Sequence, residues 1–169
     1  MNLCICRQPD SIEAIARRLL AKESGMNPEE IVISRTENGK PVCSALPFYF
    51  SGSHSGDYLA CVTAQQPVGL DLEQVRPVHP RLLRALSPQE QAYMLALPQT
   101  QRDEGFFRLW TLKESWIKCQ GGRLLQFRQA VFQLDGTRIL SGPAGYSFSF
   151  LQAPAGYVLA LCVQEENPL

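Results

Sequence analysis

Two carboxylates lie two residues apart in an otherwise apolar stretch, residues 68–73 (VGLDLE). If this stretch is a β-strand, the spacing places Asp71 and Glu73 on the same face, with the leucines on the other. Two like charges beside apolar surface repel one another and resist desolvation, so a cation between them would stabilise both. A solvated strand end is the alternative, and this pair by itself does not exclude it.

A third carboxylate lies in residues 110–118 (WTLKESWIK). Glu114 and Lys118 are one helical turn apart in the order that favours an ion pair, and an ordinary surface pair is the alternative. Aromatic residues surround them, so we expect both to lie at the edge of the core. With Asp71 and Glu73, Glu114 would complete an oxygen site suited to Mg²⁺, which binds a few carboxylates and completes its shell with phosphate and water.

Basic and polar groups that suit an anionic ligand lie upstream of these carboxylates. Lys40 occupies a predicted tight turn, and His54 follows Ser53 within residues 51–57, which their polar, glycine-containing composition predicts to be a second turn. Arg17 lies on the first predicted helix. Each has an ordinary alternative, such as a solvated lysine or an arginine whose stem packs on the helix surface. Together they would supply donors for a phosphate.

The elements that must position these groups are helices and short strands. Capping residues and apolar stripes of helical period predict helices at residues 10–25, 87–98 and 100–120, the first beginning with a capping box of Asp10 and Glu13. Strands are predicted at residues 31–35, 48–50, 58–64, 68–73, 130–134, 146–151 and 157–162. This order indicates an α+β fold in two similar halves, each with a helix packed on a small antiparallel sheet.

Composition narrows the classes of function. The 169 residues suffice for one domain or two small lobes, and 45% apolar with 19% charged residues is a globular composition. Sixteen basic residues balance sixteen acidic ones, so no global field favours nucleic acid or an anionic membrane as a partner. No signal-peptide core or membrane-spanning stretch is found, so we expect a cytoplasmic protein whose six cysteines are reduced.

In order and spacing, these motifs resemble those of the surfactin-synthetase-activating (Sfp-like) type of 4′-phosphopantetheinyl transferase. The shared pattern is a Gly-Lys-Pro turn, a Ser-His-Ser turn, Gly-x-Asp-x-Glu and then Trp-x-x-Lys-Glu-Ser/Ala-x-x-Lys. The chain has these motifs at residues 39–41, 53–55, 69–73 and 110–118. Relative to that pattern the chain is shortened at the N-terminus, and Ser51 stands where asparagine is common.

The resemblance implies a pseudo-twofold α+β fold and a single unit spanning residues 1–169, with approximate lobes 1–66 and 67–169. It implies an enzyme that transfers the 4′-phosphopantetheine arm of coenzyme A, bound between the lobes, to a serine of an apo acyl, peptidyl or polyketide carrier protein. The second product would be 3′,5′-ADP. We expect a monomer that acts without nucleic acid or membrane.

The resemblance also implies roles for individual residues. Mg²⁺, with Mn²⁺ as the alternative, would be held by Asp71, Glu73 and Glu114. Glu114 would take the proton of the carrier serine, and Lys118 would stabilise the pyrophosphate and help to protonate the leaving group. Positions matching those near the nucleotide and phosphates of coenzyme A are Arg17, Lys40, Ser53, His54 and Lys113. Carrier proteins are typically acidic, so the candidates for carrier docking are Arg76, Arg81 and Arg84, which follow the strand of the proposed metal ligands; ordinary solubilising arginines are the alternative.

Two other functions stay open at this point. A relative that binds coenzyme A or a carrier without turnover is one, although pure binding has no need of three carboxylates and a lysine. A magnesium phosphohydrolase acting on a small phosphate ester is the other. It would explain Asp71, Glu73 and Glu114 but would leave Lys40 and His54 unexplained at their spacings.

Overall fold

Local capping signals define the first two helices of the computed structural model, which describes residues 1–122 and 126–166. Helix α1 (Ile12–Ser24) begins after Ser11, whose Oγ accepts the main-chain N–H of Ala14 at 3.1 Å, and ends at Gly25 with φ 74°. The prediction that Asp10 is the N-cap is wrong. Ser11 is the N-cap, and the carboxylate of Asp10 accepts the N–H of Ser11. Helix α2 (Pro88–Ala96) has the predicted capping box.

Helix α3 (Arg102–Gln120) follows one turn of 3-10 helix, η3 (Gln99–Gln101), and ends at Gly121 with φ 68°. The last carbonyl groups of a helix lack partners within it, and here the turn at residues 36–40 supplies those partners. Asn38 Nδ2 donates to Gly121 O at 3.1 Å, and Lys40 Nζ donates to Cys119 O at 3.0 Å. The predicted Gly-Lys-Pro turn is therefore tied to the end of the helix that carries Glu114 and Lys118.

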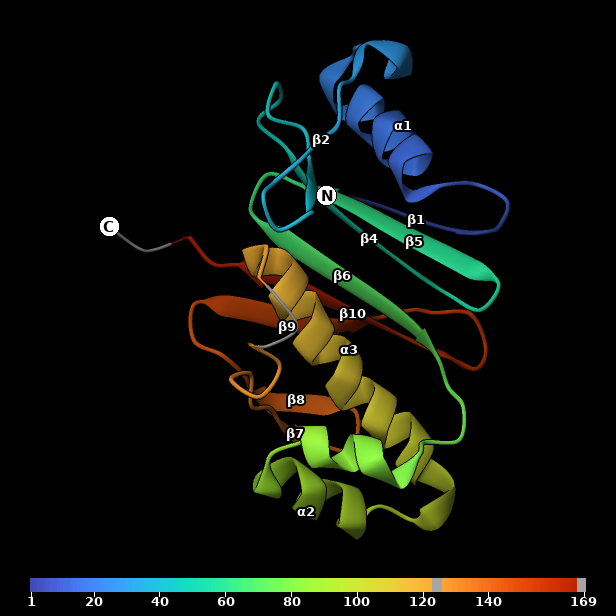
Figure 1. Cartoon of the computed structure of the whole chain (residues 1–169), viewed down its shortest axis with the longest axis vertical. Coiled ribbons are helices and arrows are strands. Elements are labelled where there is room, and N and C mark those ends of the chain that lie inside the picture. The colour runs from blue at the N-terminus through green and yellow to red at the C-terminus, as the bar shows by residue number, and fades with distance from the viewer. Residues whose placement is uncertain (123–125, 167–169) are drawn as a thin grey trace.

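Two three-stranded antiparallel sheets form the framework, with strand orders β1-β5-β4 and β6-β10-β9 (Figure 1). Their strands are β1 (Asn2–Arg7), β4 (Tyr49–Ser55), β5 (Tyr58–Ala64), β6 (Val68–Gln74), β9 (Tyr146–Leu151) and β10 (Tyr157–Gln164). Two-stranded ribbons are formed by β2 (Ser34–Arg35) with β3 (Pro41–Val42) and by β7 (Gln133–Asp135) with β8 (Arg138–Ser141). Further 3-10 helices are η1 (Pro28–Glu30) and η2 (Pro80–Ala85).

Each sheet is covered on one face by a helix, α1 on the first and α3 on the second (Figure 1). Ile15 and Leu20 of α1 pack with Phe50 of β4, whereas α3 packs its apolar side chains on β10 in the largest core cluster. A third cluster joins the halves through leucines and valines of β5, β6 and β10. The predicted α+β class, with a helix on a small antiparallel sheet in each half, is confirmed.

Three strand and turn predictions are corrected. Of the predicted strand 31–35 only the last two residues pair, because Ile31 turns into the core beneath α1. The predicted strand 130–134 begins only at Gln133, after an irregular segment in which Ala130 and Phe132 are buried and Val131 is exposed. Most importantly, the polar residues 51–55 form part of β4 rather than a turn, and the turn is confined to the residues that follow.

A close approach between α3 and β6 sets the geometry of the site. A Cβ atom built on Gly69 would lie 1.8 Å from the carbonyl oxygen of Ser115, far inside van der Waals contact. Only glycine allows the helix to pack this tightly on the strand. The predicted alternation along β6 is confirmed, since Leu70 and Leu72 face the cluster between the sheets. Because successive side chains of a strand point to opposite faces, Asp71 points toward α3.

None of the helices in the described ranges has the length and apolar character needed to cross a membrane.

Candidate active site

Asp71 is the most deeply buried carboxylate of the predicted set, at 4% exposure. Its Oδ1 accepts from Lys118 Nζ at 2.7 Å and from Ser53 Oγ at 2.9 Å. Lys118 Nζ also donates to Ser53 Oγ at 3.0 Å and to Leu70 O at 3.2 Å. The amine of α3 is therefore held by β6 and β4, and the ion pair that it forms is with Asp71 rather than with Glu114.

Two other carboxylate oxygens of the predicted site lack donors. Asp71 Oδ2 and Glu114 Oε1 are buried without a hydrogen-bond partner, and Trp116 Nε1 is the third such side-chain atom in the described ranges. Burying a carboxylate oxygen without a partner costs free energy, because the lost hydration is not replaced. A cation that contacts both oxygens would remove that cost.

The electrostatics of the two carboxyl groups agree with this geometry. Burial raises the pKa of Glu114 to about 7, and the negative charge of Asp71 adds to the effect. Burial also raises the pKa of Asp71, although the neighbouring amine of Lys118 and the hydroxyl of Ser53 lower it in part. A divalent cation at this position would favour both ionised forms.

Glu73 lies on the same face of β6 but has donors of its own. Its Oε2 accepts from Ser55 Oγ at 2.8 Å and from Arg76 Nη1 at 3.1 Å, and the guanidinium of Arg76 lies 4.9 Å from the centroid of the Phe107 ring. As the side chains stand, no three His, Cys, Asp or Glu residues among those described form a group ready to hold a metal. The donor set of buried, unpaired carboxylate oxygens nevertheless fits a hard cation such as Mg²⁺.

Lys113 lies apart from these residues. Its side chain is fully buried and pairs with Glu90 Oε1 at 2.9 Å, and its Nζ also donates to the carbonyl oxygens of Phe127, at 3.3 Å, and of Ala130. Consecutive helical residues project about 100° apart, so Lys113 and Glu114 point to different sides of α3. Its placement in the core does not support the expected position of Lys113 beside a nucleotide.

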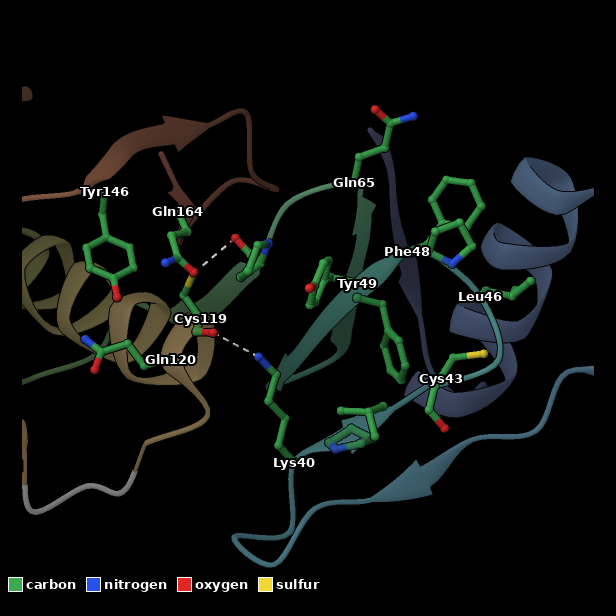
Figure 2. Close-up of a pocket in the computed structure, with 16 residues that line it drawn as sticks. Lys40, Cys43, Leu46, Phe48, Tyr49, Gln65, Cys119, Gln120, Tyr146 and Gln164 are labelled. Atoms are coloured by element: carbon green, nitrogen blue, oxygen red, sulfur yellow. Dashed lines mark hydrogen bonds between the residues drawn. The ribbon is translucent and has the colours of Figure 1, made fainter. Parts of the chain in front are cut away.

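Lys40 lines two pockets at the boundary between the halves. A pocket of about 250 Å³ is also lined by Gly52 and Lys118. A larger one of about 810 Å³ lies beyond the end of α3, where Figure 2 shows Lys40 reaching toward Cys119, with Tyr49 on the opposite wall. Burial lowers the pKa of the Lys40 amine. Asp71, Glu73 and Glu114 do not line this larger pocket. The candidate site is therefore identified from the side chains of β6 and α3 and not from the size of a cavity.

Arg17 and His54 lie toward the α1 side of the first sheet. His54 is exposed and alternates with Ser53, so it shares the face of β4 on which Gly52 meets Ile12 of α1. Arg17 is half-buried on α1. Both belong to the part of the chain that the structure describes, and it gives neither a side-chain hydrogen bond nor an ion pair. Their role in binding a phosphate stays a prediction.

The two donors that hold Glu73, Ser55 and Arg76, are not predicted from the sequence. Ser55 belongs to a run of serines at positions 51, 53 and 55, and this period of two is typical of one face of a strand. The arginine at position 76 follows Glu73 at the i,i+3 spacing. This alternation is visible in the sequence, but the glycines beside the serines favour a turn, so a turn is predicted there instead of a strand.

Sequence comparisons with known proteins agree with the motifs. The sequence profile of the 4′-phosphopantetheinyl transferase superfamily matches residues 67–162. A 4′-phosphopantetheinyl transferase of Bacillus subtilis is 33% identical over 159 residues, which cover 89% of this chain and 70% of that protein. The 4′-phosphopantetheinyl transferase Sfp of Bacillus subtilis (strain 168) is 28% identical over 158 residues, with the same coverage of 89% and 70%. The crystal structure of Thermotoga maritima holo-[acyl-carrier-protein] synthase (AcpS) aligns with a TM-score of 0.49 at 20% identity, covering 60% of this chain and 64% of that one.

Proposed function

Since this chain belongs to the 4′-phosphopantetheinyl transferase superfamily, we propose that it transfers the phosphopantetheine arm of coenzyme A to a serine of an apo carrier protein. We propose Mg²⁺ as the cofactor and 3′,5′-ADP as the second product. The observation that carries the proposal is the pair of buried oxygens without donors, Asp71 Oδ2 and Glu114 Oε1. The other carboxylate oxygen of Asp71, Oδ1, accepts a hydrogen bond from the amine of Lys118.

The three carboxylates and the lysine of the site each have a part in this reaction. Asp71, Glu73 and Glu114 would hold Mg²⁺, which when bound offsets the charge of the pyrophosphate. Glu114 accepts the proton of the carrier serine, a weak nucleophile until a base takes that proton. The serine oxygen bonds to the phosphorus that bears pantetheine while the bond from that phosphorus to the bridging oxygen breaks. The bridging oxygen leaves with 3′,5′-ADP, and Lys118 stabilises the charge that develops on it.

We further propose that residues 1–169 act as one monomeric unit with lobes near 1–66 and 67–169. Lys118 of the second lobe donates to Ser53 Oγ of the first at 3.0 Å, so both lobes contribute to the site. Arg17, Lys40 and His54 would bind the nucleotide and phosphates from the first lobe. A cytoplasmic location stays a prediction from the sequence.

An intact-mass assay tests the transfer directly. The purified protein is incubated with coenzyme A, Mg²⁺ and a panel of apo acyl, peptidyl and polyketide carriers, beside a sample with EDTA. We expect a metal-dependent gain of about 340 Da on at least one carrier, the mass of one phosphopantetheine arm attached to a serine. No gain, with coenzyme A still bound, would indicate a binding protein without turnover. Phosphate released from a simple ester without carrier modification would indicate a phosphohydrolase.

The exposed surface of η2 is the proposed docking site for the carrier. Arg81, Leu82 and Arg84 are exposed there, and this basic and apolar combination suits an acidic helical partner. Arg76, the third arginine of the predicted set, is bound to Glu73 and is left out of the test.

We expect the double substitution Arg81→Glu with Arg84→Glu to raise the KM for carrier about tenfold, because charge reversal slows the encounter of the two proteins. The KM for coenzyme A should stay unchanged. Steady-state kinetics with each substrate varied in turn measures both values, and Lys22→Glu, an exposed charge reversal on α1, is the control. A carrier KM that the double substitution leaves unchanged would remove η2 from the interface.

A further inference from the structure

Side chains of β4, rather than its main-chain groups, make the hydrogen bonds that join it to β6. The two strands lie side by side but belong to different sheets. Ser51 Oγ accepts the N–H of Leu70 at 3.0 Å, Ser53 Oγ donates to Asp71 at 2.9 Å, and Ser55 Oγ donates to Glu73 at 2.8 Å. All three serines are buried. We call Ser51, Ser53 and Ser55 the serine ladder.

The rungs of the serine ladder differ in what they hold. Ser51 bonds to a main-chain N–H, so it joins the strands without touching the proposed site. Ser53 shares Asp71 Oδ1 with the amine of Lys118. Ser55 donates to Glu73 Oε2 and accepts the N–H of Gln74 at 3.1 Å, so its hydroxyl is oriented by β6 on both sides.

Ser55 is better placed than Arg76 to hold Glu73. The side chain of Arg76 is 56% exposed, and an exposed ion pair contributes little because water and salt screen it. Ser55 as a whole is only 9% exposed, and its hydroxyl already accepts the main-chain N–H of Gln74. Both donors bind Oε2 of Glu73, so Oε1 is left for another partner.

We infer that Ser55 is a positioning residue: its hydroxyl holds the Glu73 carboxylate on the α3 side of β6, so that Glu73 can join Asp71 and Glu114 around a divalent cation. The inference rests on the proposed function, since it gives Glu73 the task of a metal ligand. Groups that orient metal ligands commonly change metal affinity by about 10- to 100-fold when they are removed.

Metal affinity and fold stability are measured separately in three variants. Mn²⁺ is titrated in the presence of coenzyme A and without carrier, free Mn²⁺ is followed by electron paramagnetic resonance, and the thermal unfolding midpoint is recorded for each protein. We expect Ser55→Ala to weaken Mn²⁺ binding about tenfold or more. Ser55→Thr, which keeps the hydroxyl, should bind nearly as the wild type does. Ser51→Ala, which removes a rung from the same strand face, should lower the unfolding midpoint but leave Mn²⁺ affinity unchanged.

The outcomes separate this inference from the proposed function. Unchanged Mn²⁺ affinity in Ser55→Ala, beside normal binding by the wild type, would overturn the role of Ser55 and leave the proposed metal site standing. An equal loss in Ser51→Ala would also overturn it, because the effect would then belong to the strand contact as a whole. Failure of the wild type to bind Mn²⁺ would overturn the proposed metal site and the inference with it.

Discussion

Replacing Glu114 with glutamine is expected to slow transfer to the carrier by about 10³-fold, as removal of a general base commonly does. The amide cannot accept the proton of the serine, and it withdraws one negative charge from the proposed metal site. The variant should fold at least as well as the wild type, because Oε1 of Glu114 has no donor to lose and its charge is repelled by Asp71. Initial rates of carrier modification and the thermal unfolding midpoint measure the two effects.

Glu104→Gln is the matched control for this prediction. Glu104 lies exposed on the same helix and makes an ion pair with the half-buried Arg108, four residues further along. Its replacement should change neither rate nor midpoint appreciably, since i,i+4 pairs on a helix contribute only about 0.3–0.5 kcal/mol. A Glu114→Gln enzyme that modifies carrier at the wild-type rate would show that Glu114 is neither the base nor a metal ligand.

Lys113→Met is expected to lower the free energy of unfolding by about 3–5 kcal/mol, because it leaves Glu90 as a buried charge without its partner. Both side chains are fully buried, and Glu90 also accepts the N–H groups of Ser87 at 2.8 Å and of Phe132 at 3.0 Å. Methionine fills a similar volume, so the loss of charge pairing dominates the loss of packing. Urea denaturation measures the change.

Adding Glu90→Gln to Lys113→Met should recover part of the lost stability, since the unpaired charge is then removed. A stable single variant would contradict the importance of this buried pair. The KM for coenzyme A, measured on folded protein at low temperature, distinguishes the structural role from the expected one. A raised KM with unchanged stability would support the position of Lys113 beside the nucleotide that the motif implies.

Features encoded by neighbouring residues could be predicted from the sequence. The stops at Gly25 and Gly121 and the capping box of Ser87 and Glu90 depend on groups within one turn of the chain. The common face of Asp71 and Glu73 follows in the same way from the period of a strand.

Features that depend on distant partners could not be predicted. The serines of β4 resemble turn residues until their partners, 18 or 19 positions along the chain, are known. The motif implies a position near the nucleotide for Lys113, and only the fold brings Glu90 and the carbonyl of Ala130 to it. Nothing local in β6 shows that its sheet partner is β10, from the far end of the sequence, rather than the preceding strand.

The join between β4 and β6 has a consequence for how this enzyme tolerates mutation. Neighbouring strands of an ordinary sheet are held by main-chain groups that nearly every amino acid carries, so most substitutions leave the join intact. Here the join is made by hydroxyl groups, and changing one serine codon removes a rung while the ladders of both sheets stay whole. Natural selection can therefore change these bonds between β4 and β6 one residue at a time, while the apolar cluster between the sheets continues to hold the two halves together.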